Sequence, residues 1–201
     1  MIAYASRTGT RRNLAALRAA GWRLMVSARG ALRPEGFRFA LDNGAWTAHR
    51  RGEPFDARAF GHALSLLGPG ADFVVVPDAV MDADGTRRLS AEWLPRVLDA
   101  TGMVLLAVQD GMETDVLPLG PRVGVFVGGS TEWKEATIPA LALRAHRAGA
   151  VCHVGRVNSA RRLAICTAAG ADSFDGSSAS RYAVTLPGLD ATRRQIGLFA
   201  R

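Results

Sequence analysis

The sequence predicts an α/β protein: a compact, single-domain TIM-type barrel of eight parallel strands, each followed by a helix or a long connection. Two observations support this fold class. Apolar runs alternate with amphipathic stretches along the chain, which is the pattern of repeated βα units. Of the 201 residues 48% are hydrophobic, enough to bury a sizeable core. We find no internal repeat, low-complexity tract or linker, so residues 1–201 are expected to form one domain.

The strands are predicted from short runs rich in aliphatic residues. They are expected at residues 1–6, 23–27, 38–41, 73–78, 104–108, 124–127, 151–154 and 171–175. The run at 73–78 is almost wholly apolar, as expected of a strand covered on both faces.

The helices are predicted at residues 13–20, 56–67, 86–100, 135–148, 159–169 and 192–200. Asp56 is suited to cap the second of them, and Pro95 is expected to kink or split the third. The chain is short for an eight-stranded α/β barrel, which usually has about 250 residues. An open doubly wound sheet is therefore the alternative, because the sequence does not show closure.

The charge composition favours a polyanionic partner. The formal net charge is +7, and Lys134 is the only lysine, so arginine supplies nearly all the cations. A basic surface attracts nucleic acid by electrostatics alone. A biased genome composition explains the choice of arginine over lysine but leaves the excess of positive charge unexplained.

The cysteine count and the hydropathy indicate a reduced, cytoplasmic setting without membrane contact. Cys152 and Cys166 are too few for a disulfide framework and lack the paired spacing of a zinc site. The first residues lack the basic-then-apolar order of a signal peptide, and no apolar run reaches the roughly 18 residues of a membrane helix. No metal and no cofactor is expected.

Polar residues and glycines follow most of the predicted strands. They are Asp42-Asn43, Asp78, Gln109-Asp110, Gly128-Gly129, Gly155-Arg156 and Asp175. A barrel brings the carboxyl ends of its strands to one rim, where α/β barrels carry their chemistry. Each residue alone fits a helix cap or a turn equally well. Three strand-end aspartates together with a glutamine and a Gly-Gly pair form a more specific set.

This set suits chemistry on a nucleoside. One carboxylate can attack an electrophilic sugar carbon and hold it as an ester, while a second moves protons. Carboxylate and amide groups suit the edge of a purine-like base, and glycines let a ligand approach backbone amides. Trp46 offers a stacking face. We therefore predict Asp175 as the nucleophile. His153, on an inner strand, is expected to be a hydrogen-bonded core residue.

Six segments in order between about residues 39 and 181 resemble one family. The segment Asp172-Ser173-Phe174-Asp175-Gly176, running on to Arg181, resembles the nucleophile segment of the tRNA-guanine transglycosylase superfamily. The others are Leu41-Asp42-Asn43-Gly44-Ala45-Trp46, Val76-Pro77-Asp78, Val108-Gln109-Asp110-Gly111, Gly124-Val125-Phe126-Val127-Gly128-Gly129 and His153-Val154-Gly155-Arg156-Val157. Within that superfamily the chain is most similar to the short DNA-acting 7-deazaguanine transglycosylases of phages and DNA-modification systems.

The resemblance implies an enzyme that exchanges guanine in a polynucleotide for a 7-deazaguanine base through a covalent Asp175 intermediate. It implies that Asp42 is the general acid/base and that Asp78 and Gln109 read the base. Asn43, Gly155 and the backbone near Gly124, Gly128 and Gly129 are expected to help bind it, and Trp46 to stack on it. Arg181, Lys134 and Arg156 are expected to contact the nucleic acid, although Trp133 beside Lys134 fits packing on the barrel equally well.

The departures from the family refine the expectation. The chain lacks the family's Cys-rich zinc subdomain, so zinc and the tRNA contacts of that subdomain are not expected, and the polymer is expected to be DNA. Gly129 replaces an acidic residue that would hold a cationic arm, which favours the neutral nitrile of 7-cyano-7-deazaguanine. Val154 stands in place of a stacking methionine.

Two alternatives remain open at this point. The same exchange on tRNA is the first, and a non-catalytic nucleic-acid-binding barrel that assists a partner enzyme is the second. An accessory protein that delivers the target nucleotide fits either reading.

Overall fold

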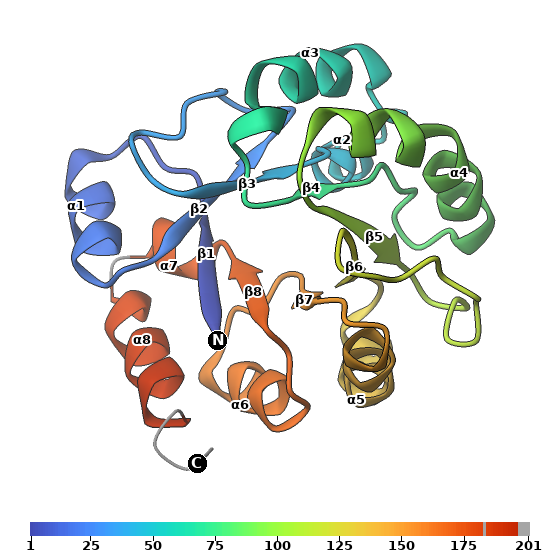
Figure 1. Ribbon diagram of the computed structural model, residues 1–201. Coiled ribbons are helices and arrows are strands. Elements are labelled where there is room, and N and C mark those ends of the chain that lie inside the picture. The colour runs from blue at the N-terminus through green and yellow to red at the C-terminus, as the bar shows by residue number, and fades with distance from the viewer. Residues whose placement is uncertain (183, 197–201) are drawn as a thin grey trace.

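The computed structural model describes residues 1–182 and 184–196, and it contains the predicted closed barrel of parallel strands. The strands follow one another in chain order, and β8 pairs with β1 to close the barrel (Figure 1). Their bounds are β1 Ile2–Ser6, β2 Arg23–Ser27, β3 Phe39–Asp42, β4 Val74–Val75, β5 Val104–Val108, β6 Val123–Val127, β7 Cys152–Val154 and β8 Ser173–Gly176. The barrel is thus the correct fold, and the open sheet is excluded.

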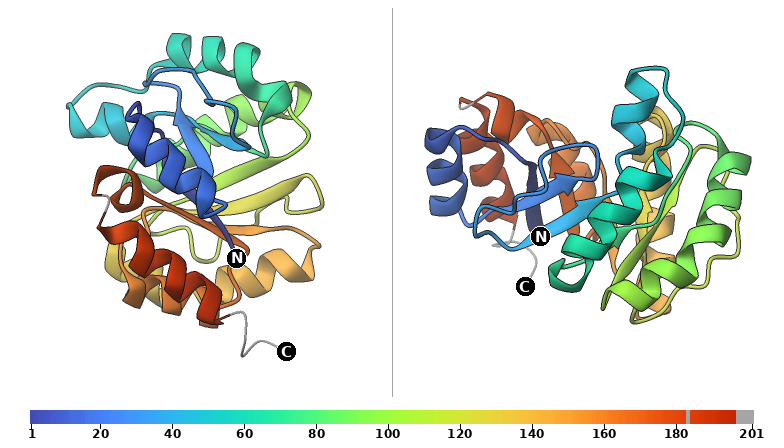
Figure 2. Two further views of the ribbon diagram at one scale, coloured as in Figure 1. Left: turned by 90° about the vertical axis from the view of Figure 1, so that its left-hand side faces the viewer. Right: turned by 90° about the horizontal axis from the view of Figure 1, so that it is seen from above.

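Helices surround the barrel in all three views (Figures 1 and 2). They are α1 Arg11–Ala19, α2 Ala45–Arg50, α3 Ala57–Leu67, α4 Ala83–Ala100, α5 Thr131–Arg147, α6 Ala160–Ala168, α7 Ser178–Arg181 and α8 Thr185–Ile196, with a 3-10 turn at Gly68–Gly70. β2 and β5 lead through loops to the next strand, whereas each of the other strands is followed by a helix. Those helices begin on the side of the barrel where the strands end. None of the described helices has the length and apolar composition needed to cross a membrane.

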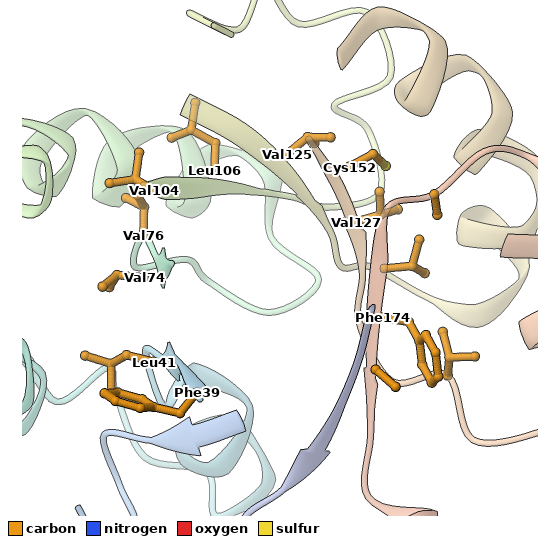
Figure 3. Packing of buried hydrophobic residues seen from close by; sticks show 14 of the residues in the cluster. Phe39, Leu41, Val74, Val76, Val104, Leu106, Val125, Val127, Cys152 and Phe174 are labelled. Atoms are coloured by element: carbon orange, nitrogen blue, oxygen red, sulfur yellow. The ribbon is translucent and has the colours of Figure 1, made fainter. Parts of the chain in front are cut away.

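The larger part of the core lies between the strands and the helices. Alternate strand residues point outward and pack against the helices, since side chains alternate along a strand. Figure 3 shows these residues, among them Leu41, Val76, Leu106, Val127 and Phe174. Along each strand, one set of alternate residues therefore faces the helices, and the other set faces the barrel interior.

The barrel interior contains an apolar layer and, at the amino ends of the strands, a cluster of polar residues. Tyr4, Met25, Phe73 and Leu105 are among the buried residues of the apolar layer. At the amino ends of the strands, Asp72 accepts a hydrogen bond from the Tyr4 hydroxyl at 3.1 Å. It also forms ion pairs with Arg23 at 3.0 Å and with Arg38 at 2.7 Å. Burial raises the pKa of Tyr4 to about 12.

The helices differ from the prediction in several respects. α1, α4 and α5 begin two to four residues before the predicted residues 13, 86 and 135. The helix containing Pro95 is not split, because Trp93 and Val97 on either side of the proline are both buried and hold the helix on the barrel. The two short helices α2 and α7 were not predicted, since each lies within a loop too short to show helical periodicity. The final helix begins at Thr185, before the predicted residue 192, and the predicted residues 197–200 lie outside the described part of the chain.

Candidate active site

A cavity of about 730 Å³ opens at the carboxyl ends of the strands. Most of the residues that the sequence marks as functional line it: Asp42, Asn43, Trp46, Asp78, Gln109, Gly128, Gly129, Arg156, Asp175 and Arg181. They come from the ends of six strands and the loops that follow. The closed barrel therefore brings together residues separated by more than 130 positions in the chain, as a barrel active site requires.

Asp175 lies on β8 with its carboxylate at the cavity wall. Its exposed fraction is 9%, and because the residue lines the cavity a ligand bound there can reach it. The oxygen Oδ1 is 3.1 Å from Nε2 of His153 on the neighbouring strand β7. This leaves Oδ2 without a hydrogen-bond partner among the described residues, which is the state needed for nucleophilic attack.

Asp42 ends β3, and its oxygen Oδ2 accepts a hydrogen bond from the amide of Gly44 at 3.2 Å. Burial, together with the charges of Asp175 and Asp78, raises the pKa of Asp42 to about 7, while hydrogen bonds from Ser27 and Gly44 act in the opposite direction. A group with a pKa near 7 exists in both protonation states at neutral pH. It can therefore both donate and accept a proton during one reaction cycle.

Asp78 follows β4 and is held by two side-chain amides. Asn43 donates from Nδ2 to Oδ1 of Asp78 at 2.8 Å, and Gln109 donates from Nε2 to Oδ2 at 2.5 Å. Burial raises the pKa of Asp78, while these two hydrogen bonds act in the opposite direction. The carboxylate is fixed in orientation and presents an acceptor edge to the cavity.

Gln109 serves mainly to hold other parts of the site. Its Oε1 accepts hydrogen bonds from the amide of Gly129 at 2.9 Å and the amide of Met81 at 3.2 Å, while its Nε2 is bound to Asp78. The side chain is 3% exposed. The expectation that Gln109 and the Gly129 amide both contact the base directly is thus not supported in this conformation, because each is satisfied by the other.

Gly129 has a left-handed backbone, with φ of 70°. A Cβ there would lie 2.4 Å from Oδ1 of Asp110 and 2.7 Å from the Trp133 ring, so no larger residue fits. Asp110 in turn accepts hydrogen bonds from the amide and the hydroxyl of Ser130, both at 2.6 Å, and Ser130 caps α5. Asp110 therefore supports the loop after β6, and its carboxylate is already occupied.

Trp46 and Arg156 meet across the mouth of the cavity. Trp46 belongs to α2 after β3, and Arg156 follows β7 on the opposite side of the barrel. The guanidinium carbon lies 4.2 Å from the centre of the indole ring, and the guanidinium also donates to the carbonyl of Gly129. Arg156 has a left-handed φ of 59°. One face of Trp46, predicted to stack on a base, is thus covered by Arg156.

Three predicted residues lie outside the cavity wall. Lys134 is 4% exposed and donates from Nζ to the carbonyl of Gly155 at 2.6 Å, so the structure places the amine predicted to contact nucleic acid away from the surface. Burial lowers its pKa to about 8. Gly124 lies near the amino end of β6, where it packs against Leu105 and Val151, and not at the carboxyl end that faces the cavity. Gly155 does not line the cavity, and it packs so closely against the Phe126 ring that a Cβ at this position would clash with the ring.

The cavity also contains basic residues that the sequence reasoning did not select. Arg7, Arg50 and Arg162 line it together with Arg181. Arg7 pairs with Glu35 at 2.5 Å and Arg162 with Glu135 at 3.3 Å. Arg50 and Arg181 form no ion pair with the described residues. The excess of arginine in the sequence indicates a basic surface, but only the fold shows which arginines line the cavity.

No group of three or more His, Cys, Asp or Glu side chains among the described residues is arranged to hold a metal ion.

Neither a family model nor a curated protein matches the chain. Among solved structures it is similar to the native KDPGal structure, with 12% identity and a TM-score of 0.52 over 98% of this chain and 95% of that one. It is also similar to RipC from Yersinia pestis, with 12% identity and a TM-score of 0.53 over 98% of this chain and 94% of that one. A designed cube-shaped protein cage has 11% identity and a TM-score of 0.53 over 98% of this chain and 72% of that one. At these identities the likeness shows a shared barrel fold and nothing further.

Proposed function

We propose that this barrel exchanges guanine in DNA for a 7-deazaguanine base, with Asp175 as the nucleophile and Asp42 as the acid/base. The observation that carries the proposal is the state of Asp42: a carboxyl with a pKa of about 7, facing the same cavity as Asp175 and Asp78. Two carboxyl groups in different environments divide acid/base and nucleophilic roles in glycosyl chemistry.

The proposed reaction has two displacements. Oδ2 of Asp175 forms a bond to the anomeric carbon of the nucleoside, the bond from that carbon to guanine breaks, and protonated Asp42 gives its proton to the departing base. The incoming 7-deazaguanine then gives a proton to ionised Asp42 and bonds to the same carbon, and its electron pair displaces Asp175 as a free carboxylate. Each step leaves Asp42 in the form that the next step needs.

Asp78 is the base-reading residue of this proposal. An ionised carboxylate only accepts hydrogen bonds, and the Watson–Crick edge of guanine and of 7-deazaguanine offers adjacent N–H donors. The amides of Asn43 and Gln109 hold the carboxylate in place. The neutral nitrile arm of 7-cyano-7-deazaguanine suits the site because Gly129 carries no side chain and Asp110 is bonded to Ser130.

The rim arginines support a polynucleotide substrate. Arg11 and Arg12 open α1, which has no acidic residue in its first turn. Arg161 and Arg162 lie in the first turn of α6 and pair with Glu135 of α5. Cations at a helix N-terminus oppose the helix dipole and cost roughly 0.3–1 kcal/mol each. A phosphate backbone across the rim would offset that cost. Arg193 and Arg194, in the last turn of α8, pair with Asp190 of the same helix.

The test is incorporation of labelled guanine by the protein into duplex DNA, single-stranded DNA or tRNA, each with the Asp175→Ala variant as control. We expect Asp175-dependent label in DNA. Label only in tRNA would retain the chemistry and replace the polymer. No label in any polymer, with retained salt-dependent binding, would overturn the catalytic proposal in favour of a binding barrel that assists a partner enzyme.

A further inference from the structure

We infer that His153 is a positioning residue for Asp175: it holds the carboxylate for attack and stabilises it as the leaving group when the glycosyl ester breaks. This inference rests on the proposed function, since it concerns the nucleophile of that reaction. It concerns a residue that the sequence suggested was only part of the core.

His153 is fixed from every side. It is completely buried, and its ring stacks on Phe126 with 5.0 Å between ring centres and 17° between planes. The edges of Phe73 and Tyr4 pack against it at 5.1 and 5.8 Å. A histidine enclosed by three aromatic rings cannot change its rotamer without repacking the barrel interior.

The hydrogen bonds of His153 set the direction of its protons. Nε2 is 3.1 Å from Oδ1 of Asp175, and Nδ1 is 2.8 Å from Oγ of Ser173. An ionised carboxylate can only accept, so Nε2 carries a proton toward Asp175. The Ser173 hydroxyl can donate to Nδ1 and thereby favour this tautomer of a neutral imidazole.

The order of these three groups resembles a Ser-His-Asp triad, but the geometry assigns the roles differently. Asp175 lines the cavity, whereas Ser173 lies deeper in the barrel and is not part of the cavity wall. Ser173 therefore cannot act as the nucleophile. The chain of hydrogen bonds runs outward from Ser173 through His153 to the reactive carboxylate.

The bond from His153 has opposite effects on the two half-reactions. When Oδ2 forms the ester, Asp175 loses its negative charge, and the hydrogen bond to Oδ1 weakens. When the ester breaks, the electron pair of the carbon–oxygen bond returns to the carboxylate, and the N–H group stabilises the charge that develops there. Loss of the N–H donor should therefore slow breakdown of the ester more than its formation.

The experiment compares His153→Phe with His153→Gln. The phenylalanine keeps an aromatic ring and removes both hydrogen bonds, whereas the glutamine amide can replace the Nε2–H donor. With saturating DNA and labelled guanine, turnover is measured together with the fraction of protein linked to DNA in a denaturing gel. Circular dichroism checks that each variant is folded.

We expect His153→Phe to lower turnover by about 10- to 100-fold while the linked fraction rises above that of the unchanged protein. His153→Gln should recover most of the turnover and the lower linked fraction. A linked fraction that falls in proportion to turnover in both variants would overturn the inference. If His153→Phe does not fold, His153→Gln and Ser173→Ala decide: the inference then requires a raised linked fraction in Ser173→Ala and little change in His153→Gln. Absence of linked DNA and exchange in the unchanged protein would refute the proposed function itself.

Discussion

The two ends of the barrel contain carboxylates in opposite electrostatic situations. At the amino ends of the strands, Asp72 is matched by Arg23, Arg38 and the Tyr4 hydroxyl. At the carboxyl ends, no ion pair within residues 1–182 and 184–196 joins an arginine or lysine to any of three aspartates: Asp42, Asp78 and Asp175.

The difference separates stability from function within one barrel. A buried carboxylate that is paired and hydrogen-bonded contributes to a specific native state, whereas crowded carboxylates without a direct ion-pair partner destabilise it. Functional sites commonly retain such destabilising groups because the chemistry needs them. The comparison therefore predicts that mutations at the two ends will affect different quantities.

The largest expected effect is that of Asp175→Ala. Loss of the nucleophile should lower guanine exchange by at least about 10³-fold, as removal of a nucleophile does in other enzymes. The free energy of unfolding should remain within about 1 kcal/mol, because the substitution also relieves charge crowding around Asp42. Exchange kinetics and urea unfolding measure the two quantities. Exchange at the unchanged rate would remove Asp175 from the mechanism.

Asp72→Ala should produce the opposite pattern. It leaves Arg23, Arg38 and the Tyr4 hydroxyl without their acceptor at the closed end of the barrel, and the expected loss is about 3 kcal/mol of unfolding free energy. Exchange by the folded fraction should be unchanged, since Asp72 lies at the other end from the cavity. A variant that unfolds normally but exchanges slowly would break the division between the two ends.

Asp42→Asn tests the electrostatics of the open end through pH. The raised pKa means that Asp42 contributes stability fully below its ordinary value of 3.8 and loses that contribution as the pH rises through about 7. The unfolding free energy of the unchanged protein should therefore fall by about 2 kcal/mol more than that of Asp42→Asn between pH 5 and pH 8. Parallel pH profiles of the two proteins would show that Asp42 titrates normally.

The same titration predicts the pH dependence of exchange. Protonated Asp42 is needed for departure of guanine, so the rate constant of the first displacement should fall above about pH 7. Single-turnover release of guanine from DNA, measured from pH 5 to pH 9, gives this dependence. A rate that rises continuously to pH 9 would assign the proton transfer to a different group.

The smallest expected effect is at the rim arginines. Arg11→Ala with Arg12→Ala should reduce the slope of log affinity for duplex DNA against log salt concentration by up to about 0.9 for each phosphate that these arginines neutralise. The same change should stabilise α1 by about 0.5 kcal/mol per charge, because it removes cations from the helix N-terminus. The control is Arg194→Ala, because Arg194 lies in the last turn of α8 and not at the start of a helix. This variant should leave the slope of log affinity against log salt concentration unchanged.

The sequence predicts the barrel well because its strands are strongly apolar and regularly spaced. It also predicts the aspartates of the site, since Asp42, Asp78 and Asp175 each follow such a run. The partnership of His153 with Asp175 was not predictable, because it depends on the register that places His153 beside Ser173 across β7 and β8.

Lys134 was predictable from a signal that was overlooked. Lys134, Ile138, Leu141 and Ala145 recur at helical spacing, and all four are buried on one face of α5. The predicted helix began at Glu135, so Lys134 was left outside it and was not recognised as part of the buried face. Gly124 is a different case: its position came from the resemblance, and its place at the amino end of β6 follows from strand direction.

The burial of Lys134 has a practical consequence for reagents that modify amines. Lys134 is the only lysine of residues 1–201, and its amine becomes accessible to an acylating agent when the contact between α5 and Gly155 opens. Burial holds the Lys134 pKa at about 8 only while the contact is closed, so the amine regains the ordinary pKa of a lysine when the contact opens. Mass spectrometry of acylated protein would thus time the separation of α5 from β7 without any engineered probe.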